Sequence, residues 1–262
     1  MRARLRVVSP SSPVVLNSKE SNWLRPSLVA SWREIAIVLL LVTGPFLFNS
    51  ALGAWKGTSN HYFSLILTNS KLLGNIAIQA SILGLLLIYL QRRGWLAKDF
   101  KIRCGVLSSL QAIPLTLAMM LVNTLVVVGL YALLYLSHSQ SGKFLSFVAA
   151  HSQHVAPHSI HVGWLVIITA MVLNAFFEEI ICIGYAFNQF AAKQGPFFAL
   201  LLIVMVRMAY HTYEGPIHML GVGASFFVSG LVYWWTRNLW PLIVSHALID
   251  LGSASFLKIA FS

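Results

Sequence analysis

Long apolar segments restrict what this chain can fold into more than any other feature of its sequence. After residue 33, runs dominated by Leu, Ile, Val, Phe and Ala recur to the end of the chain, with polar stretches between them. A helix of about 20 apolar residues crosses the hydrocarbon core of a bilayer, so these runs predict membrane-spanning helices. Because only 10% of the residues are charged and the mean hydropathy is +0.76, a soluble domain is excluded. The expected fold is an all-α, polytopic membrane helical bundle.

The composition divides the chain into three regions. Residues 1–33 contain Ser, Pro and Arg, and we expect a loose, basic cytosolic arm that ends in a short interfacial helix near residues 23–32. Residues 34–160 hold three spans and a polar outer loop, and residues 161–257 hold four more. About seven spans are predicted in all, at residues 34–54, 72–90, 106–136, 161–193, 197–213, 218–236 and 239–257.

The formal charge of +11 sets the expected orientation rather than indicating a nucleic-acid partner. Most basic residues before the third span flank the first two apolar runs instead of forming one face, as the positive-inside rule requires of cytosolic ends. We therefore expect no nucleic acid, membrane lipid as a partner, a cytosolic N-terminus and a place in the plasma (inner) membrane. The residues concerned are Arg2, Arg4, Arg6, Lys19, Arg25, Arg33, Arg92, Arg93, Lys98, Lys101 and Arg103.

Histidines gather in the polar stretch before the fourth span. His151, His154, His158 and His161 have the spacing of one helix face and could bind a metal. Pro157 interrupts that helix, however, and no cysteine or acid joins the group. We interpret the stretch as a solvated, pH-responsive outer loop, with a metal site as the alternative.

Two adjacent acids, Glu178 and Glu179, lie inside a segment that otherwise reads as a membrane span. An acid at the bilayer centre costs about 2.5–3.5 kcal/mol on insertion scales, so neither side chain is expected to face lipid. They must face a polar or wet cavity, which marks a functional site. Successive helical side chains point about 100° apart, so one carboxylate should face the cavity while the other braces the site.

Two histidines on later spans are the expected partners of these acids. Counted from the turn at 194–196, His211 and Glu178 lie at similar depth on antiparallel helices, where a carboxylate and an imidazole could activate a water. His246 and Asp250 are four residues apart, within hydrogen-bond reach on one helix face. The aspartate would orient His246, whose imidazolium is a good donor to an oxyanion.

These motifs resemble one known family. The stretch EEIICIGY, the later His211 and the closing FFVSGLVYWWTRNLWPLIVSHALID are similar to the CPBP family, the CAAX-protease and bacteriocin-processing (Abi) intramembrane proteases, over about residues 162–255. The resemblance implies a helical membrane bundle and a glutamate-dependent endopeptidase with its catalytic core in residues 161–257. It implies that Glu178 is the general base, that His211 assists it and that Glu179 is a supporting acid, with His246 and Asp250 at the oxyanion. No metal or cofactor is implied, and the substrate is a peptide or protein, lipidated or membrane-associated.

The sequence departs from the motifs of this family at three positions. Ile183 stands where EExxxR has arginine, and Arg207 stands where FxxxH has phenylalanine. Both positions should lie at the same depth on antiparallel helices, so we predict that Arg207 supplies the missing guanidinium and pairs with Glu179. Asp250 stands where CAAX-type members carry asparagine. An ionised aspartate would repel an oxyanion, so Asp250 should either orient His246 or be protonated.

The same residues are also compatible with other functions. A zinc hydrolase could use Glu178, His211 and His246 as ligands, although the sequence has no HExxH motif. Cys182 could be a nucleophile paired with His211, but its apolar neighbourhood disfavours the thiolate. A non-catalytic transporter, immunity or scaffold protein could also carry these intramembrane acids.

Overall fold

The computed structural model describes residues 23–55, 68–137 and 162–260, and these residues form helices and no strand. The predicted all-α class is therefore confirmed. The proposed histidine loop (His151, His154, His158 and His161) and the first 22 residues of the arm lie outside the described residues.

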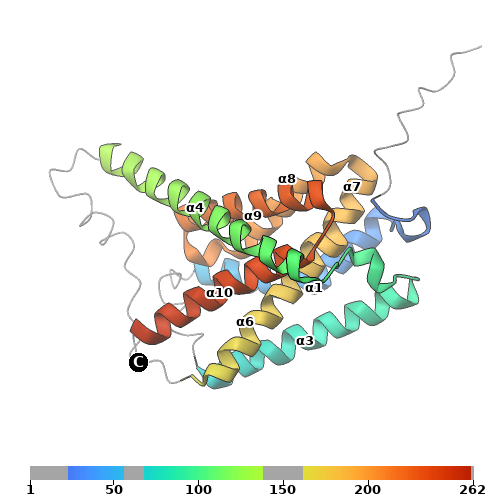
Figure 1. Ribbon diagram of the computed structural model, residues 1–262, viewed down its shortest axis with the longest axis horizontal. Helices are drawn as coiled ribbons and strands as arrows, with labels where there is room; N and C mark the ends of the chain where they lie inside the picture. Colours follow the sequence, from blue (N-terminus) through green and yellow to red (C-terminus); the bar gives the residue numbers. More distant parts are fainter. Residues whose placement is uncertain (1–22, 56–67, 138–161, 261–262) are drawn as a thin grey trace, which may run out of the picture.

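One helical rod corresponds to each predicted span (Figure 1). Five are long and apolar enough to cross a membrane, at Trp32–Gly53, Asn69–Arg92, Val106–Leu136, Trp164–Gln194 and Pro216–Thr236. The chain is thus an integral membrane protein, and the number of seven spans stays a prediction. The helices are α1 (Trp32–Trp55), α3 (Asn69–Arg92), α4 (Val106–Ser137), α6 (Trp164–Glu179), α7 (Asn188–Gln194), α8 (Pro196–Tyr210), α9 (Pro216–Thr236) and α10 (Trp240–Ala260).

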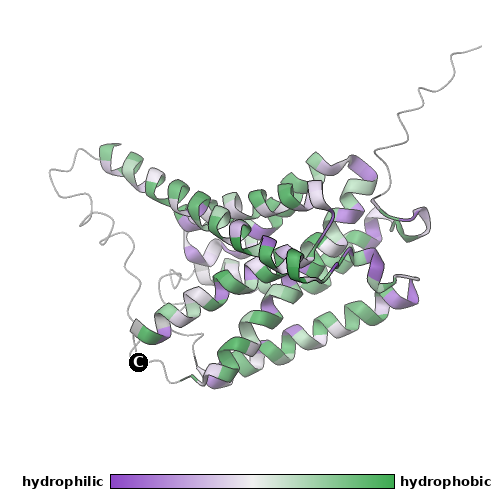
Figure 2. Ribbon diagram, viewed as in Figure 1, coloured by the Kyte–Doolittle hydropathy of each residue, from purple (hydrophilic) through white to green (hydrophobic). Residues whose placement is uncertain are grey.

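The apolar surface of these helices explains how the bundle sits in lipid. In α4, the large side chains of Leu110, Leu117, Leu121 and Leu125 are all more than half exposed. Hydrophobic residues cover the long helices, and hydrophilic ones gather at one end, where α3 ends and α7 turns into α8 (Figure 2). Exposed leucines along a whole helix are stable only in contact with hydrocarbon, so this face is the lipid-facing one.

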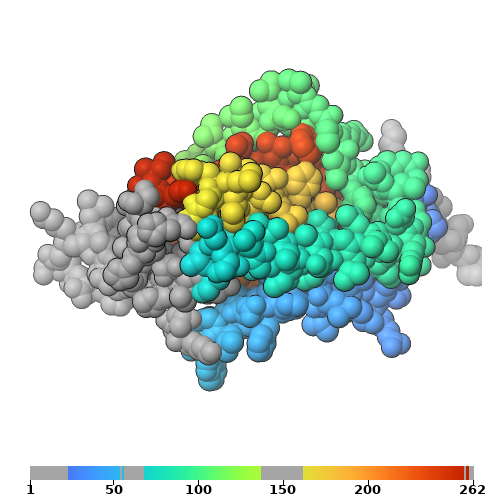
Figure 3. Space-filling view, turned by 90° about the horizontal axis from the view of Figure 1, so that it is seen from below, coloured from blue at the N-terminus to red at the C-terminus, as the bar shows by residue number. Residues whose placement is uncertain are grey.

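α6 packs between two other helices of the bundle and carries the acidic pair. It packs against α3 on one side and α10 on the other, and α10 packs in turn against α4. From the face shown in Figure 3, α6 (yellow) comes to the surface between α3 (teal) and α10 (red). α8 packs against α9 and α1, so that α6, α8 and α10 surround one interior region.

A π-helix, Ile180–Phe187, joins α6 to α7 directly after the acidic pair. All eight of its residues are buried. The side chain of Asn188 donates to the carbonyl oxygen of Gly184 at 2.9 Å and thus satisfies an acceptor in the widened turns. A side chain at Gly184 would press on Leu239 and Phe100, with contacts of 3.2 Å to each. Extended π-helical turns are rare and frequently mark functional sites, and nothing in the apolar sequence predicted this one.

The end of the N-terminal arm is packed, not loose. Trp23 is 1% exposed and lies edge-on to Phe187. The side chain of Gln189 accepts from the backbone N–H of Ala30 and donates to the carbonyl oxygen of Leu28, each at 2.9 Å. The expected interfacial helix near residues 23–32 is replaced by a short 3₁₀ turn, Pro26–Leu28, and α1 begins at Trp32. A buried aromatic anchor and two backbone hydrogen bonds hold this segment against the core.

Candidate active site

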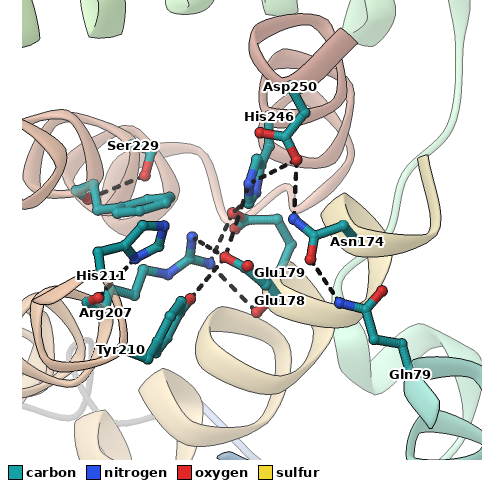
Figure 4. A network of polar contacts seen from close by, with 11 residues as sticks. Gln79, Asn174, Glu178, Glu179, Arg207, Tyr210, His211, Ser229, His246 and Asp250 are labelled. Atoms are coloured by element: carbon teal, nitrogen blue, oxygen red, sulfur yellow. Dashed lines mark hydrogen bonds and ion pairs between the residues drawn. The ribbon is translucent and has the colours of Figure 1, made fainter. Parts of the chain in front are cut away.

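Three helices bring the predicted side chains together in the interior of the bundle. The last turn of α6 carries Glu178 and Glu179, the end of α8 carries Arg207, and α10 carries His246 and Asp250. Figure 4 shows these groups directed toward one another. The intramembrane acids therefore face charged and polar partners and not lipid, as the cost of burying them requires.

Arg207 pairs with Glu179, as predicted. Its Nη2 lies 2.7 Å from Glu179 Oε1, and both side chains are 1% exposed. The guanidinium also stacks on Phe226, 3.9 Å from the ring centroid, and its Nη2 lies 3.3 Å from the carbonyl oxygen of Glu178. The guanidinium thus stands beside the acids although Ile183 occupies the arginine position of the motif. An arginine at 207 can replace one at 183 because the two positions lie at equal depth on antiparallel segments.

His246 is held by Glu179, not by Asp250. Its Nδ1 lies 3.0 Å from Glu179 Oε1. The other ring nitrogen, Nε2, lies 3.6 Å from Asp250 Oδ2 and 3.8 Å from Glu178 Oε2, both beyond hydrogen-bond distance. Asp250 lies within ion-pair distance of His246 Nε2 but forms no hydrogen bond with it, so its orienting role stays a prediction, while Glu179 holds the Nδ1 side of the ring.

Glu178 is the more accessible of the two acids. Its side chain is 13% exposed, against 1% for Glu179. Its Oε2 accepts a hydrogen bond from the hydroxyl of Tyr210 at 2.7 Å and lies 3.6 Å from Arg207 Nη1. The other oxygen, Oε1, makes no hydrogen bond with a described residue. One carboxylate therefore faces the open side of the site while the other braces it.

His211 lies beside this cluster and not in it. α8 ends at Tyr210, so His211 follows the helix, and its Nδ1 contacts the carbonyl oxygen of Arg207 at 2.9 Å. It interacts electrostatically with Glu178 but forms no ion pair with it within 4.0 Å in the described chain. The direct partner of Glu178 is Tyr210, which no pattern in the sequence singled out. The assisting role of His211 stays a prediction.

Asp250 is bound by an amide that the sequence analysis missed. Asn174 Nδ2 donates to Asp250 Oδ2 at 2.9 Å, and Gln79 Nε2 donates to Asn174 Oδ1 at 2.7 Å. Both amides interrupt apolar runs, and Asn174 stands four residues before Glu178, on the same face of α6. Polar residues at such positions are the signal that would have identified them.

The geometry gives less support to a zinc hydrolase and to a cysteine nucleophile. The described residues contain no group of three or more His, Cys, Asp or Glu side chains placed to hold a metal ion. Zinc bound by Glu178, His211 and His246 would need His211 to move toward the cluster. Cys182 is a free, buried cysteine, 2% exposed, inside the π-helix.

Several buried polar atoms of the cluster have no hydrogen-bond partner in the described chain. They are Glu179 Oε2, Arg207 Nε and Arg207 Nη1. Buried charged groups are almost always hydrogen-bonded, to protein or to ordered water. These atoms therefore indicate a site that binds water next to the carboxylates.

Comparison with known families locates the resemblance in the same part of the chain. Residues 160–252 match the family model described as "Type II CAAX prenyl endopeptidase Rce1-like". No curated protein and no solved structure matches the chain. The matched residues include α6, the π-helix, α8 and α9, and they reach past Asp250 in α10. The segment that builds the cluster of acids, arginine and histidine is thus similar to the CAAX proteases, the family that the sequence motifs indicate.

Proposed function

We propose that this protein is an intramembrane endopeptidase that hydrolyses a peptide bond near the C-terminus of a prenylated CAAX substrate, with Glu178 as the general base. The observation that carries the proposal is the difference between the two adjacent glutamates. Glu179 is fully buried and bound to Arg207 and His246, whereas Glu178 is partly exposed with one oxygen open. An acid held in place with one oxygen open suits proton abstraction.

Glu178 and His246 are placed so that both can contact one water molecule. The 3.8 Å between Glu178 Oε2 and His246 Nε2 is too long for a direct hydrogen bond, and gaps of this size are commonly bridged by water. In the proposed step, Glu178 takes a proton from water as its oxygen attacks the substrate carbonyl carbon. The proton then passes to the leaving amine nitrogen as the C–N bond breaks, which regenerates the carboxylate.

His246 stabilises the oxygen that becomes negative in this step. Its Nδ1–H is held by Glu179, so the ring is fixed with Nε2 toward Glu178 and Asp250. With both nitrogens protonated, Nε2–H donates to the developing oxyanion. The chain of partners from Arg207 through Glu179 to His246 thus sets the orientation of the donor.

The substrate and the orientation in the membrane belong to the same proposal. The name of the matched family indicates a prenylated C-terminus, and a prenyl chain would be soluble in the lipid around the exposed apolar helices. Arg92 ends α3, and Arg93, Lys98 and Lys101 lie between α3 and α4. The positive-inside rule favours the cytosol for that end, and therefore for the N-terminus. The plasma membrane is the proposed location.

The test compares glutamate variants on a defined substrate. Purified protein in detergent micelles is incubated with a farnesylated CAAX peptide, and products are identified by mass spectrometry. We expect Glu178→Gln to lower kcat by about 10²–10⁴-fold, the usual contribution of a general base. Glu34→Gln is the matched control, since Glu34 pairs with Arg93 away from the site. Cleavage at the wild-type rate by Glu178→Gln would overturn the proposal, and inhibition by chelators that zinc reverses would favour a zinc hydrolase.

A further inference from the structure

Asp250 lies at the end of a directed chain of amides that crosses three helices. Gln79 in α3 donates to Asn174 in α6, and Asn174 donates to Asp250 in α10 (Figure 4). Because Asn174 uses its oxygen to accept from Gln79, its NH₂ group must face the aspartate. The chain therefore fixes one oxygen of Asp250, Oδ2, as a hydrogen-bond acceptor.

The acids around Asp250 outnumber the cations, because Glu178, Glu179 and Asp250 share only Arg207 and His246 among the described residues of this cluster. Arg207 is committed to Glu179 at 2.7 Å. His246 is hydrogen-bonded to Glu179, and its Nε2 lies within 4.0 Å of both Asp250 and Glu178, so one imidazolium charge is shared among three acids. The hydrogen-bond partner of Asp250 in the described chain is the neutral amide of Asn174.

A third negative charge beside Glu178 and Glu179, inside a membrane bundle, would be costly. The other titratable group that faces Asp250 is His211, which acts on it only electrostatically. A neutral carboxylic acid avoids the cost and keeps the hydrogen bond from Asn174.

We propose that Asp250 works as a neutral carboxylic acid with its proton on Oδ1, and that Gln79 and Asn174 are positioning residues that direct this proton toward the substrate oxygen. The role toward substrate rests on the proposed function, whereas the protonation state does not. A neutral acid whose carbonyl oxygen accepts and whose hydroxyl donates has the same hydrogen-bonding pattern as an asparagine side chain. An apolar site can keep an acid neutral at pH 7 so that it donates to an oxyanion. Asp250 can therefore stand at the asparagine position of the motif without repelling negative charge.

Infrared spectroscopy of the whole protein in micelles tests the protonation state without any substrate. We expect a carbonyl band of a protonated carboxylic acid at neutral pH that Asp250→Asn removes and Glu178→Gln retains. Asn174→Leu should move this band to higher frequency, because the carbonyl oxygen loses its donor, and Gln79→Leu should move it less. A merely structural role of the amides would leave the band in place. A wild-type spectrum without the band would overturn the proposal.

Cleavage of the farnesylated CAAX peptide tests the role of the acid. Asp250→Asn should keep activity within about tenfold of wild type, since the amide supplies an equivalent donor, whereas Asp250→Ala should lose about 10²–10³-fold, as for other oxyanion donors. Asn174→Leu should lower kcat more than it raises KM.

The pH profile separates Asp250 from the other titrating groups. Activity of the wild type should decline at high pH as Asp250 ionises, and Asp250→Asn should remove that part of the decline and leave the rest of the profile in place. An Asp250→Asn variant as inactive as Asp250→Ala would show that the charge is needed and overturn the proposal. If the wild type cleaves no CAAX peptide, only the proposed function fails, and the infrared bands still decide the state of Asp250.

Discussion

Arg207 and Glu179 form a fully buried ion pair between α8 and α6, with 2.7 Å between Nη2 and Oε1. The same carboxylate oxygen also binds His246, so a single atom of Glu179 connects the arginine of one helix to the histidine of another. The pair therefore determines the geometry of the site as well as the packing of the helices.

An arginine moved from position 207 to position 183 should still pair with Glu179. Arg207→Phe should destabilise the protein by about 3–5 kcal/mol, because it leaves Glu179 buried without its cation. Adding Ile183→Arg restores a guanidinium at the position of the family motif, and the double variant should recover part of the stability and activity. Thermal unfolding in micelles and peptide cleavage measure both. A double variant no more stable than Arg207→Phe would contradict the equal depth of positions 183 and 207.

Substitution of the two adjacent glutamates should affect activity and stability differently. Glu178→Gln should abolish cleavage with little loss of stability, since its carboxylate is partly exposed and 3.6 Å from the arginine. Glu179→Gln should lower both, because the buried charge of Arg207 loses its partner. Unfolding temperatures of the two variants, compared at one detergent concentration, check this difference. Equal destabilisation by both would argue against the division into a base and a brace.

Tyr210 should position Glu178. Its hydroxyl donates to Glu178 Oε2 at 2.7 Å, and hydrogen bonds to charged groups contribute about 1.5–3 kcal/mol. Tyr210→Phe should therefore lower kcat about tenfold or more with a small change in KM. Tyr185→Phe is the matched control, since the Tyr185 hydroxyl is buried without a partner in the described residues and its loss should be nearly neutral. Unchanged kcat in Tyr210→Phe would remove Tyr210 from the site.

Asp99 should make the stability of the fold depend on pH, because it binds Arg25 near the start of the chain. Arg25 binds both oxygens of its carboxylate, at 2.7 and 3.2 Å, and the Leu96 N–H donates to it at 2.7 Å. Burial alone would raise the pKa of Asp99, but these hydrogen bonds and the charge of Arg25 hold that pKa below its ordinary value.

A lowered pKa in the folded state means that Asp99 stabilises the fold above the unfolded value, about 3.9, and that this contribution disappears as the pH falls through the folded value. Because Arg25 is nearly half exposed, we expect Asp99→Asn to cost no more than about 1 kcal/mol at pH 7. The difference in unfolding temperature between wild type and Asp99→Asn should shrink toward zero near the acid end of a pH series. A difference that grows with acidity would contradict the sign of the shift.

The positions of the helices could be predicted because hydropathy is a local property. The predicted third span, 106–136, corresponds to α4 (Val106–Ser137), and the fourth, 161–193, corresponds to the rod from Trp164 to Gln194. The predicted end of the fifth span at 213 was less accurate, since α8 stops at Tyr210 and a 3₁₀ turn follows. The Gly-Pro pair at 215–216 marks the start of the next helix, and nothing in the sequence distinguishes the 3₁₀ turn from helix.

The sequence predicted one pairing within the site, between Arg207 and Glu179, because Ile183 leaves the acids without the arginine of the family motif. Arg207 could be assigned to Glu179 because an arginine and an acid at equal depth in a membrane must find each other. The hydrogen bond to His246 could not be assigned, since Glu179 and Asp250 are both carboxylates within reach of it. Side-chain orientation, which sequence spacing does not specify, decided in favour of Glu179.

The sequence by itself determined an all-helical membrane protein, the approximate ends of its helices, and the acids and histidines that cannot face lipid. These follow from the cost of placing polar groups in hydrocarbon, which depends on residue type alone. Only the tertiary structure decided that Tyr210 binds Glu178, that Asn174 binds both Gln79 and Asp250, and that a π-helix follows the acidic pair. Those features depend on how α3, α6, α8 and α10 pack, and contacts between helices far apart in the chain are not recorded in any local pattern.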